Sequence, residues 1–450
     1  MKNKNIHFVS LGCPKNLIDS EVMASLLIKS GFGITPRAEE ADIIIVNTCT
    51  FILPAKEESI EEIFQMAEWK ENGKCRHLVV TGCLPQRYGP ILKREMPEVD
   101  LFLGTGEIPK IADFINNLEN GEFADRKSFI GEPSFLMDSS YPRLLSTPGC
   151  GAYLKIAEGC SNRCSYCVIP YVRGKFRSRE VNDILKEAEM LAKMGIKEIN
   201  ITAQDTTSYG SDLKGKPDLG ILLKELAFID EIRWIRLLYT YPAYLTGEIL
   251  QTIAGEEKIC NYIDIPLQHI DDDILKAMNR KGSSTLIRNT INLARKIIPG
   301  VVLRTSLIVG FPGETQEKFE RLLDFIKEVR FENLGAFEYS REEGTAAADL
   351  PFHIPEKEKE RRKNILMEEQ SGISHEINQS RIGDLEEVLI EGESDHPDFP
   401  CIGRIRGQAP EIDGITYVRA NDAAVGDIVT CRITSADIYD LFAEEVDNEE

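Results

Sequence analysis

The stretch Tyr153-Leu-Lys-Ile-Ala-Glu-Gly-Cys-Ser-Asn-Arg-Cys-Ser-Tyr-Cys167 decides the fold, because it joins an apolar, strand-like run to three closely spaced cysteines. Cys160, Cys164 and Cys167 form the pattern CxxxCxxC directly after a predicted strand at 153–157. Three thiolates can hold three corners of a [4Fe–4S] cubane, whose full protein ligation would take four cysteines. One iron would then stay open to a ligand. A zinc site completed by Cys150 is the alternative, since structural zinc prefers four protein ligands.

Downstream of these cysteines, strand-like and helix-like segments alternate as in a β/α repeat. Short apolar runs predict six strands, at 153–157, 198–202, 232–239, 262–267, 301–309 and 335–339. Amphipathic segments between them predict helices, including 181–194, 285–298 and 316–329. Six β/α units fit a partial barrel of the eight-fold type, whose working face lies at the carboxyl ends of the strands.

The first hundred residues show the same alternation and predict a separate parallel α/β sheet. Its predicted strands are 6–11, 42–48, 77–81 and 100–103. Cys13, Cys49 and Cys83 each follow one of these strands by one or two residues. The carboxyl ends of parallel strands meet at one ligand-binding edge of a sheet, so these cysteines predict a second three-thiolate cluster site.

The last part of the chain predicts a small β-barrel behind a charged helix at 356–379. Short strands punctuated by Gly and Asp fit a barrel near the size of an oligonucleotide-binding fold. Residues 379–450 contain 5 Arg, no Lys and 18 Asp plus Glu, a net charge of −13. Such a domain repels phosphates, so it is suited to a basic partner and not to nucleic acid.

Composition limits the remaining possibilities. With 450 residues, 42% of them hydrophobic and 28% charged, the chain is typical of a soluble globular protein of two or three domains. No apolar run approaches the roughly 20 residues of a membrane-spanning helix, and the N-terminus has no signal-peptide core. We therefore expect a cytoplasmic protein, in which eleven cysteines indicate metal ligation and not disulfides.

The CxxxCxxC motif behind the first strand of a six-fold β/α repeat resembles the radical S-adenosylmethionine (SAM) superfamily. The resemblance implies that SAM chelates the open iron and is cleaved to a 5′-deoxyadenosyl radical. Gly310-Phe-Pro-Gly-Glu314 is similar to the glycine-rich segment of the family, on the adenine side. The predicted SAM contacts are Gln204, Asp205, Gly310 and Gly313. Arg177 and Arg179 are predicted to hold a carboxylate of SAM or of the substrate. Gln268 and His269 are predicted to contact the substrate.

Two cluster sites followed by a small barrel resemble the methylthiotransferase family over essentially the whole chain. Four segments resemble its RimO type: SLGCPKNLIDSE at 10–21, YLKIAEGC at 153–160, DIPLQH at 264–269 and APEIDG at 409–414. One departure is Gln408, where relatives more often have an acidic residue.

This resemblance implies a reaction, its cofactors and its partners. A methylthio group would be added to the β-carbon of an aspartate in ribosomal protein uS12. One SAM would methylate a sulfur on the cluster of Cys13, Cys49 and Cys83, and a second would supply the radical that removes the β-hydrogen. The implied cofactors are two [4Fe–4S] clusters and SAM, with a low-potential electron donor such as flavodoxin or ferredoxin.

Two other functions stay open on the sequence. The tRNA-directed relatives share the cysteines, Arg173-Gly174 and Ser178-Arg179, although the charge of −13 on the barrel counts against an RNA substrate. A two-cluster electron carrier would need no β/α barrel. The expected domains are an N-terminal parallel α/β methylthiotransferase domain at 4–122, a partial (β/α)6 radical SAM core at 146–376 and a TRAM-type, OB-like antiparallel β-barrel at 379–445.

Overall fold

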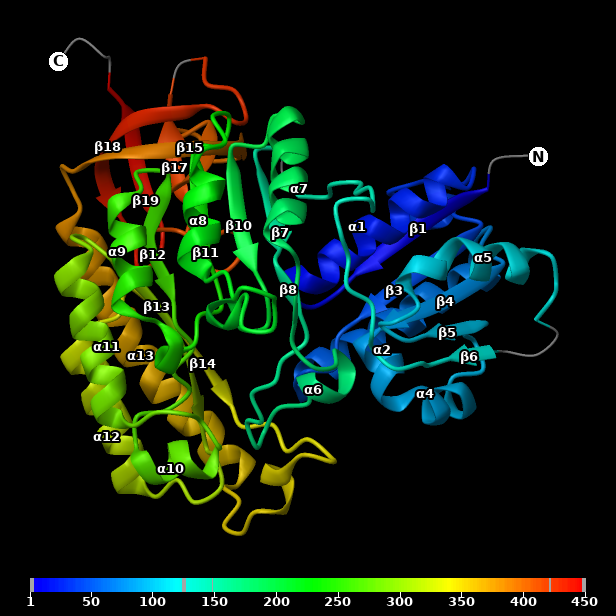
Figure 1. Cartoon of the computed structure of the whole chain (residues 1–450), viewed down its shortest axis with the longest axis horizontal. Coiled ribbons are helices and arrows are strands. Elements are labelled where there is room, and N and C mark those ends of the chain that lie inside the picture. Colours follow the sequence, from blue (N-terminus) through cyan, green and yellow to red (C-terminus); the bar gives the residue numbers. More distant parts are fainter. Residues whose placement is uncertain (1–3, 124–126, 148, 421, 447–450) are drawn as a thin grey trace. The chain divides into compact units, whose positions relative to one another are not determined.

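A computed structural model describes residues 4–123, 127–147, 149–420 and 422–446 (Figure 1). The chain divides into two compact units. Unit 1 comprises Met1–Ser146, Ala157–Arg179 and Ser340–Ala348, and unit 2 comprises Thr147–Ile156, Glu180–Tyr339 and Asp349–Glu450. Within the described ranges, no helix is long and apolar enough to cross a membrane.

Unit 1 is built on a six-stranded parallel sheet in the order β2-β1-β3-β4-β5-β6. Its strands are β1 (Asn5–Ser10), β2 (Gly33–Ile34), β3 (Ile43–Thr48), β4 (His77–Gly82), β5 (Leu101–Leu103) and β6 (Lys127–Phe129). Its helices are α1 (Pro14–Lys29), α2 (Leu53–Ala67), α3 (Trp69–Asn72), α4 (Cys83–Glu95), α5 (Ile111–Glu119) and α6 (Ile169–Val172). Two short strands, β8 (Ala157–Glu158) and β9 (Arg177–Ser178), pair separately.

The sheet of unit 1 is covered on both faces, which explains why its central strand reads as a continuous apolar run. Every residue of β3 is buried. Ile44 and Val46 belong to a core cluster with Ile63 of α2 and Leu92 of α4, while the alternate side chains of the strand point to the opposite face. The predicted parallel α/β sheet is confirmed. The short strands β2 and β6 were not predicted.

Unit 2 contains a second parallel sheet, in the order β14-β13-β12-β11-β10-β7. Its strands are β7 (Gly151–Lys155), β10 (Glu198–Thr202), β11 (Trp234–Leu237), β12 (Ile259–Asp264), β13 (Val302–Val309) and β14 (Asn333–Glu338). Its helices are α7 (Val181–Lys193), α8 (Leu219–Ala227), α9 (Gly247–Gly255), α10 (Asp272–Ala277), α11 (Ser284–Ile297), α12 (Gln316–Val329) and α13 (Glu356–Ser380). All six predicted strands are present, and β14 and β7 remain the two edges of an open, partial barrel.

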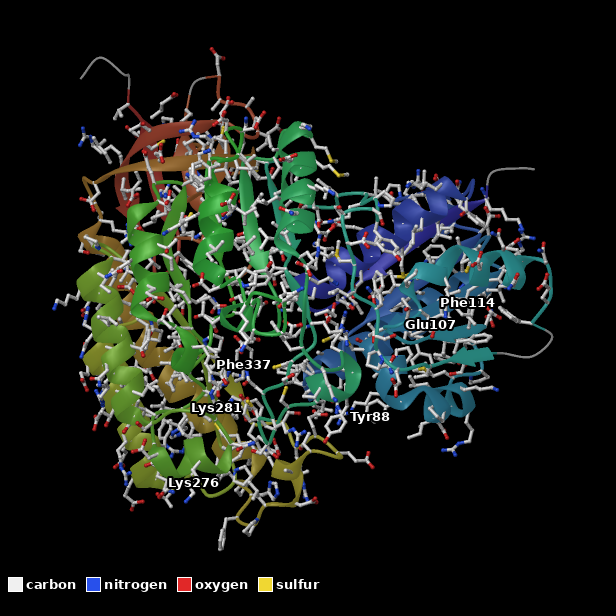
Figure 2. The ribbon with its side chains drawn as sticks, in the orientation of Figure 1. Tyr88, Glu107, Phe114, Lys276, Lys281 and Phe337 are labelled. Atoms are coloured by element: carbon white, nitrogen blue, oxygen red, sulfur yellow. The ribbon has the colours of Figure 1, made fainter. Side chains whose placement is uncertain are left out.

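The two faces of this second sheet differ in polarity. In β10, Ile199 and Ile201 point to one face, and Glu198, Asn200 and Thr202 point to the other, although all five are buried. The parallel register places Arg236 of β11 beside Asn200, on the polar face. One face of the sheet thus forms an apolar core, and the other carries the polar groups. Phe337, which is labelled in Figure 2, lies on the edge strand β14, and its side chain is 43% exposed.

The C-terminal part of unit 2 is a closed five-stranded barrel in the order β15-β16-β17-β19-β18. Its strands are β15 (Leu385–Glu393), β16 (Cys401–Ile405), β17 (Thr416–Arg419), β18 (Ile428–Ala436) and β19 (Leu441–Glu445). The pairings are antiparallel except that β17 and β19 are parallel. A closed ring with an odd number of strands cannot alternate direction throughout, so at least one parallel pair is required.

The barrel is joined to the polar face of the sheet by buried hydrogen bonds and ion pairs. Arg404 of β16 binds Glu198 of β10, and Arg236 donates from Nη1 to the carbonyl of Arg406 at 2.7 Å. The hydroxyl of Tyr262 donates to Asp413 at 2.7 Å. The barrel and the β/α sheet therefore share a polar interface and are not independent pieces of unit 2.

Candidate functional site

The first predicted cysteine triplet lies at one edge of the sheet in unit 1. Strands β1, β3 and β4 are neighbours and parallel, so their carboxyl ends lie together. Cys13 is the N-cap residue of α1, Cys49 directly follows β3, and Cys83 opens α4. The order of the strands reverses at β1, and ligands bind at such a switch point in doubly wound sheets.

Two glycines let the backbone of these cysteine loops pack closely together. Gly12 has a φ of +90°, and a Cβ there would lie 2.7 Å from Cβ and 3.0 Å from Sγ of Cys49. Gly82 has a φ of +96°, and a Cβ there would lie 2.3 Å from Oδ1 of Asn47 and 2.7 Å from the carbonyl oxygen of Thr48. Only glycine meets both demands, because other residues are strained at positive φ and would collide with the neighbouring loop.

Side chains from two helices hold the loops in place. The Asn16 amide donates to the carbonyls of Leu11 at 2.7 Å and Asn47 at 3.2 Å, so it ties together the ends of β1 and β3. Ser59 of α2 accepts the amide hydrogen of Cys49 and donates to the carbonyl of the same residue, each at 3.1 Å. These contacts fix the backbone on either side of Cys13 and at Cys49.

The thiols of the triplet influence one another electrostatically. Burial, and next the charges that Cys83 and Cys13 would carry, raise the pKa of Cys49 to about 12. Burial also raises the pKa of Cys83, against the opposing effect of Arg173. Several thiolates therefore cannot form together here without a positive partner, and iron supplies one. Three thiols at neighbouring strand ends are a donor set that fits an iron–sulfur cluster.

The second predicted triplet lies in a loop of unit 1 between β8 and α6. Cys160 is 9% exposed, and its amide donates to the carbonyl of Gly174 at 3.1 Å. The amide of Cys167 donates to the carbonyl of Cys164 at 3.1 Å, which folds the CxxC part into a turn. Gly159 has a φ of +78°, and a Cβ there would lie 2.2 Å from the carbonyl oxygen of Lys175. The loop is tightly built, and its three thiols suit a cluster with one open iron.

The zinc alternative finds no support in the arrangement of donors. Across the described parts of the chain, no group of three or more His, Cys, Asp or Glu residues is placed to hold a single metal ion. In a cubane each cysteine binds a different iron, so its ligands lie further apart than the ligands of one ion. Cys150 precedes β7 in unit 2, where its carbonyl accepts the amides of Lys197 and Glu198.

Arg177 and Arg179, the predicted carboxylate contacts, also lie in unit 1. Arg177 donates from Nη2 to the carbonyls of Arg173 at 3.2 Å and Phe135 at 3.4 Å. Arg179 is only 2% exposed. Neither residue is part of a solvated basic loop, and their role toward a carboxylate stays a prediction.

The predicted SAM contacts lie in unit 2, at the carboxyl ends of β10 and β13. Asp205 follows β10 and accepts hydrogen bonds from the amide of Ser208 at 3.2 Å and the hydroxyl of Thr207 at 2.7 Å, so it shapes the turn after Gln204. Gly310 and Gly313 follow β13 with φ values of +73° and +82°. Glu314 accepts the amide hydrogen of Gly310 at 2.9 Å and closes this turn.

His269 and Gln268 lie next to the glycine turn. His269 is fully buried, and its Nδ1 accepts the amide hydrogen of Asp271 at 2.9 Å, so the proton is on Nε2. That Nε2 lies 3.5 Å from Oε2 of Glu314, whose other oxygen pairs with Arg362 at 2.7 Å. Gln268 has a φ of +74° and pairs through its backbone with β13. A substrate contact by either residue stays a prediction, and the observed neighbour of His269 is Glu314.

Sequence reasoning missed two residues of unit 1 that connect the cysteine loops. Asn16 and Arg173 both lie in segments that were noted for their resemblance to the family, but no contact was predicted for either. Their proximity to cysteines in the sequence was the available signal. Arg173 lies 154 positions from Asp19 and 157 from Asn16, to which it donates a 2.9 Å hydrogen bond, and local patterns do not show such pairs.

Comparisons with known proteins agree with this arrangement. The Radical SAM superfamily matches residues 154–326, the TRAM domain matches 382–446, and the uncharacterized protein family UPF0004 matches 5–104. The radical SAM methyltransferase TsrM from Kitasatospora setae, solved with cobalamin and a [4Fe-4S] cluster, is 14% identical with a TM-score of 0.56, over 88% of this chain and 82% of that one. That likeness concerns the fold.

Two relatives are similar along their whole length. The ribosomal protein uS12 methylthiotransferase RimO of Syntrophus aciditrophicus is 60% identical over 449 residues, 99% of either chain. The RimO protein of Geobacter sulfurreducens is 52% identical over 441 residues, 98% of either chain. The radical SAM match implies SAM and a [4Fe–4S] cluster as cofactors. At this identity and coverage, the chain belongs to the RimO family of radical SAM methylthiotransferases.

Proposed function

We propose that this enzyme adds a methylthio group to the β-carbon of an aspartate in ribosomal protein uS12, with two [4Fe–4S] clusters. The first is assigned to Cys13, Cys49 and Cys83, and the second, which binds SAM, to Cys160, Cys164 and Cys167. The observation that carries the two-cluster assignment is that three cysteines follow adjacent parallel strands, whose end loops pack closely at Gly12 and Gly82. The names of the relatives support uS12 as the substrate.

The residues of the chain bind and orient, and the chemistry comes from the cofactors. When bound, the clusters and SAM supply the sulfur, the methyl group and the hydrogen-abstracting radical. The six cysteines provide thiolates in two sets of three, so each set leaves one iron without a protein ligand. Gln204, Asp205, Gly310 and Gly313 are the proposed SAM contacts, and Arg177, Arg179, Gln268 and His269 the proposed contacts to carboxylate and substrate.

Several further properties belong to this proposal. The domain boundaries 4–122, 146–376 and 379–445 stay a prediction, as does an electron donor such as flavodoxin or ferredoxin. A cytoplasmic location is supported by the proposed ribosomal substrate and by cysteines that need a reducing compartment.

The barrel is proposed to bind the basic substrate through its charge. Deleting the barrel is an unsuitable test, because Glu198, Arg236 and Tyr262 would lose buried partners. Neutralising three exposed acidic residues is a gentler change: Glu393 at the end of β15, and Asp395 and Asp398 in the loop before β16. A matched control neutralises Glu57, Glu58 and Glu61, which are exposed on α2.

We expect the barrel variant to bind uS12 more weakly than the control at low salt. The difference should shrink as salt is raised, since screening acts over about 10 Å at 0.1 M ionic strength. Equal binding by the two variants would show that the acidity of the barrel serves solubility only.

The direct test of the function is mass spectrometry of uS12 and of tRNA after anaerobic incubation with SAM and a reductant. The wild type should increase the mass of uS12 by one methylthio group and leave tRNA unchanged. The variant C13A/C49A/C83A should still form 5′-deoxyadenosine but should not modify uS12. Modified tRNA would contradict the substrate, and product from the variant would contradict the role of the first triplet.

A further inference from the structure

Arg173 lies between the two cysteine triplets of unit 1. It directly follows α6 and is 3% exposed. Its Nη1 donates to Oδ2 of Asp19 at 2.5 Å, and its Nη2 donates to Oδ1 of Asn16 at 2.9 Å. Oε2 of Glu158 lies 3.6 Å from the same Nη1 atom. The guanidinium thus joins α1, which begins after Cys13, to β8, which precedes Cys160.

The contacts of Arg173 extend to the cysteine-bearing loops. Asn16, which accepts a hydrogen bond from Arg173, itself holds the carbonyls that end β1 and β3. On the other side, the carbonyl of Gly174 accepts the amide hydrogen of Cys160. One guanidinium and its neighbouring peptide therefore connect loops that belong to both triplets.

Charge gives Arg173 a second effect. Its positive charge works against the rise in the pKa of the Cys83 thiol that burial causes. Burial would lower the pKa of Arg173 itself, but Cys83, Asp19 and Glu158 raise it well above its usual value. A permanent positive charge is therefore buried beside one proposed ligand of the first cluster. Lysine could supply the charge but not the planar fork that reaches Asp19 and Asn16 together.

We propose that Arg173 is a positioning residue that fixes the Cys160 loop against the Cys13 and Cys83 loops and raises the reduction potential of the cluster on Cys13, Cys49 and Cys83. The inference rests on the proposed function, since it presumes a cluster at that triplet. A nearby positive charge stabilises the reduced, more negative cluster.

Two variants separate the two effects of Arg173. R173K keeps the charge and loses the fork. R173Q/D19N removes one charge of each sign, and of the two the charge of Arg173 acts more strongly on the Cys83 thiol. The matched control is R143Q/E21Q, because Arg143 and Glu21 form another buried pair on α1, with Nη2 to Oε2 at 2.6 Å. Glu21 lies eight residues beyond Cys13, or about 12 Å along the helix axis.

The potential is measured by redox titration with electron paramagnetic resonance in the C160A/C164A/C167A background, where only the first cluster can form. R173Q/D19N should shift the potential to more negative values, and R173K and the control should not. In the chain with all six cysteines, R173K should lose methylthio transfer by about 10- to 100-fold, as changes behind metal ligands do, and still form 5′-deoxyadenosine.

Each result bears on one claim. An unshifted potential in R173Q/D19N with its iron bound overturns the electrostatic part, and full transfer by R173K overturns the positioning part. If R173Q/D19N binds no iron, the methylthio transfer by R173K still decides the positioning part. The electrostatic part is then decided by the reduction potential of R173M, which replaces the double variant in the titration. Absence of iron from the parent background contradicts the cluster on Cys13, Cys49 and Cys83 itself, and the inference falls with it.

Discussion

Two groups of buried arginines, one in each unit, differ in what balances their charge. In unit 2, Arg404 and Arg236 are at most 2% exposed and pair with Glu198 and Glu391. Two positive charges there meet two negative ones. In unit 1, Arg173 is equally buried, but its neighbours are two carboxylates and the Cys83 thiol.

The difference separates a structural network from a functional one. The network of unit 2 balances its own charges and joins the barrel to the sheet, although one buried nitrogen of Arg236, Nη2, has no hydrogen-bond partner. The group in unit 1 becomes strongly negative once the cysteines ionise, and iron in a cluster balances that charge. Arg236 also has a thiol neighbour, Cys260, but that cysteine belongs to no triplet, whereas Cys83 shares its sheet edge with Cys13 and Cys49.

The largest effect that would sharpen this comparison comes from disrupting the packing of the cysteine loops in unit 1. G82A places a Cβ against Asn47 and Thr48 and strains the backbone, so we expect the first cluster to be lost. Bound iron should fall from about eight to about four per chain, given two cubanes. The control G121A has a similar positive φ with nothing within 4 Å of its Cβ and should keep its iron. Equal iron contents in the two variants would show that the close packing at Gly82 is not needed.

Breaking the network in unit 2 should affect stability and not iron content. E198Q leaves Arg236 and Arg404 without their shared carboxylate, and breaking a buried pair typically costs about 3–5 kcal/mol in the free energy of unfolding. Denaturant unfolding followed by the fluorescence of buried Trp234 measures this. E376Q, which removes an exposed pair with Arg330, should cost about 1 kcal/mol or less. Loss of iron in E198Q would mean that this network is not merely structural.

A smaller effect is expected from acid. Burial alone would raise the pKa of Glu198, but Arg404 and Arg236 lower it to about 2, from 4.5. The stabilisation by this carboxylate is therefore complete above about pH 4.5 and is lost as the pH falls toward 2, roughly 3 kcal/mol in all. The wild type should lose stability faster than E198Q across this range. Parallel pH profiles of the two proteins would contradict the ionised state of Glu198.

Much of the fold could be predicted because it follows local patterns. The predictions for β10 and α12 agree with the structure to the residue, since each has strong periodicity and clear ends. β2 has only two residues, and β19 lies in an acidic segment, so neither gives a strand-like pattern. The parallel pairing of β17 with β19 depends on closure of the barrel, which no local pattern encodes.

The candidate site also has features that the sequence predicts and features that it does not. The meeting of Cys13, Cys49 and Cys83 could be predicted because parallel strands bring their ends to one edge. The contacts of Arg173 could not, since Asp19 lies 154 positions earlier in the chain and only the folded unit brings the two together. The pairing of His269 with Glu314 across 45 positions escaped the prediction for the same reason.

The central claim is that the two triplets hold separate clusters, and iron counting with electron paramagnetic resonance tests it most directly. The variants C13A/C49A/C83A and C160A/C164A/C167A should each retain about four irons per chain and one cubane signal, and the two signals together should account for the wild type. Complete loss of iron in either variant, or the full wild-type content in both, would contradict the account.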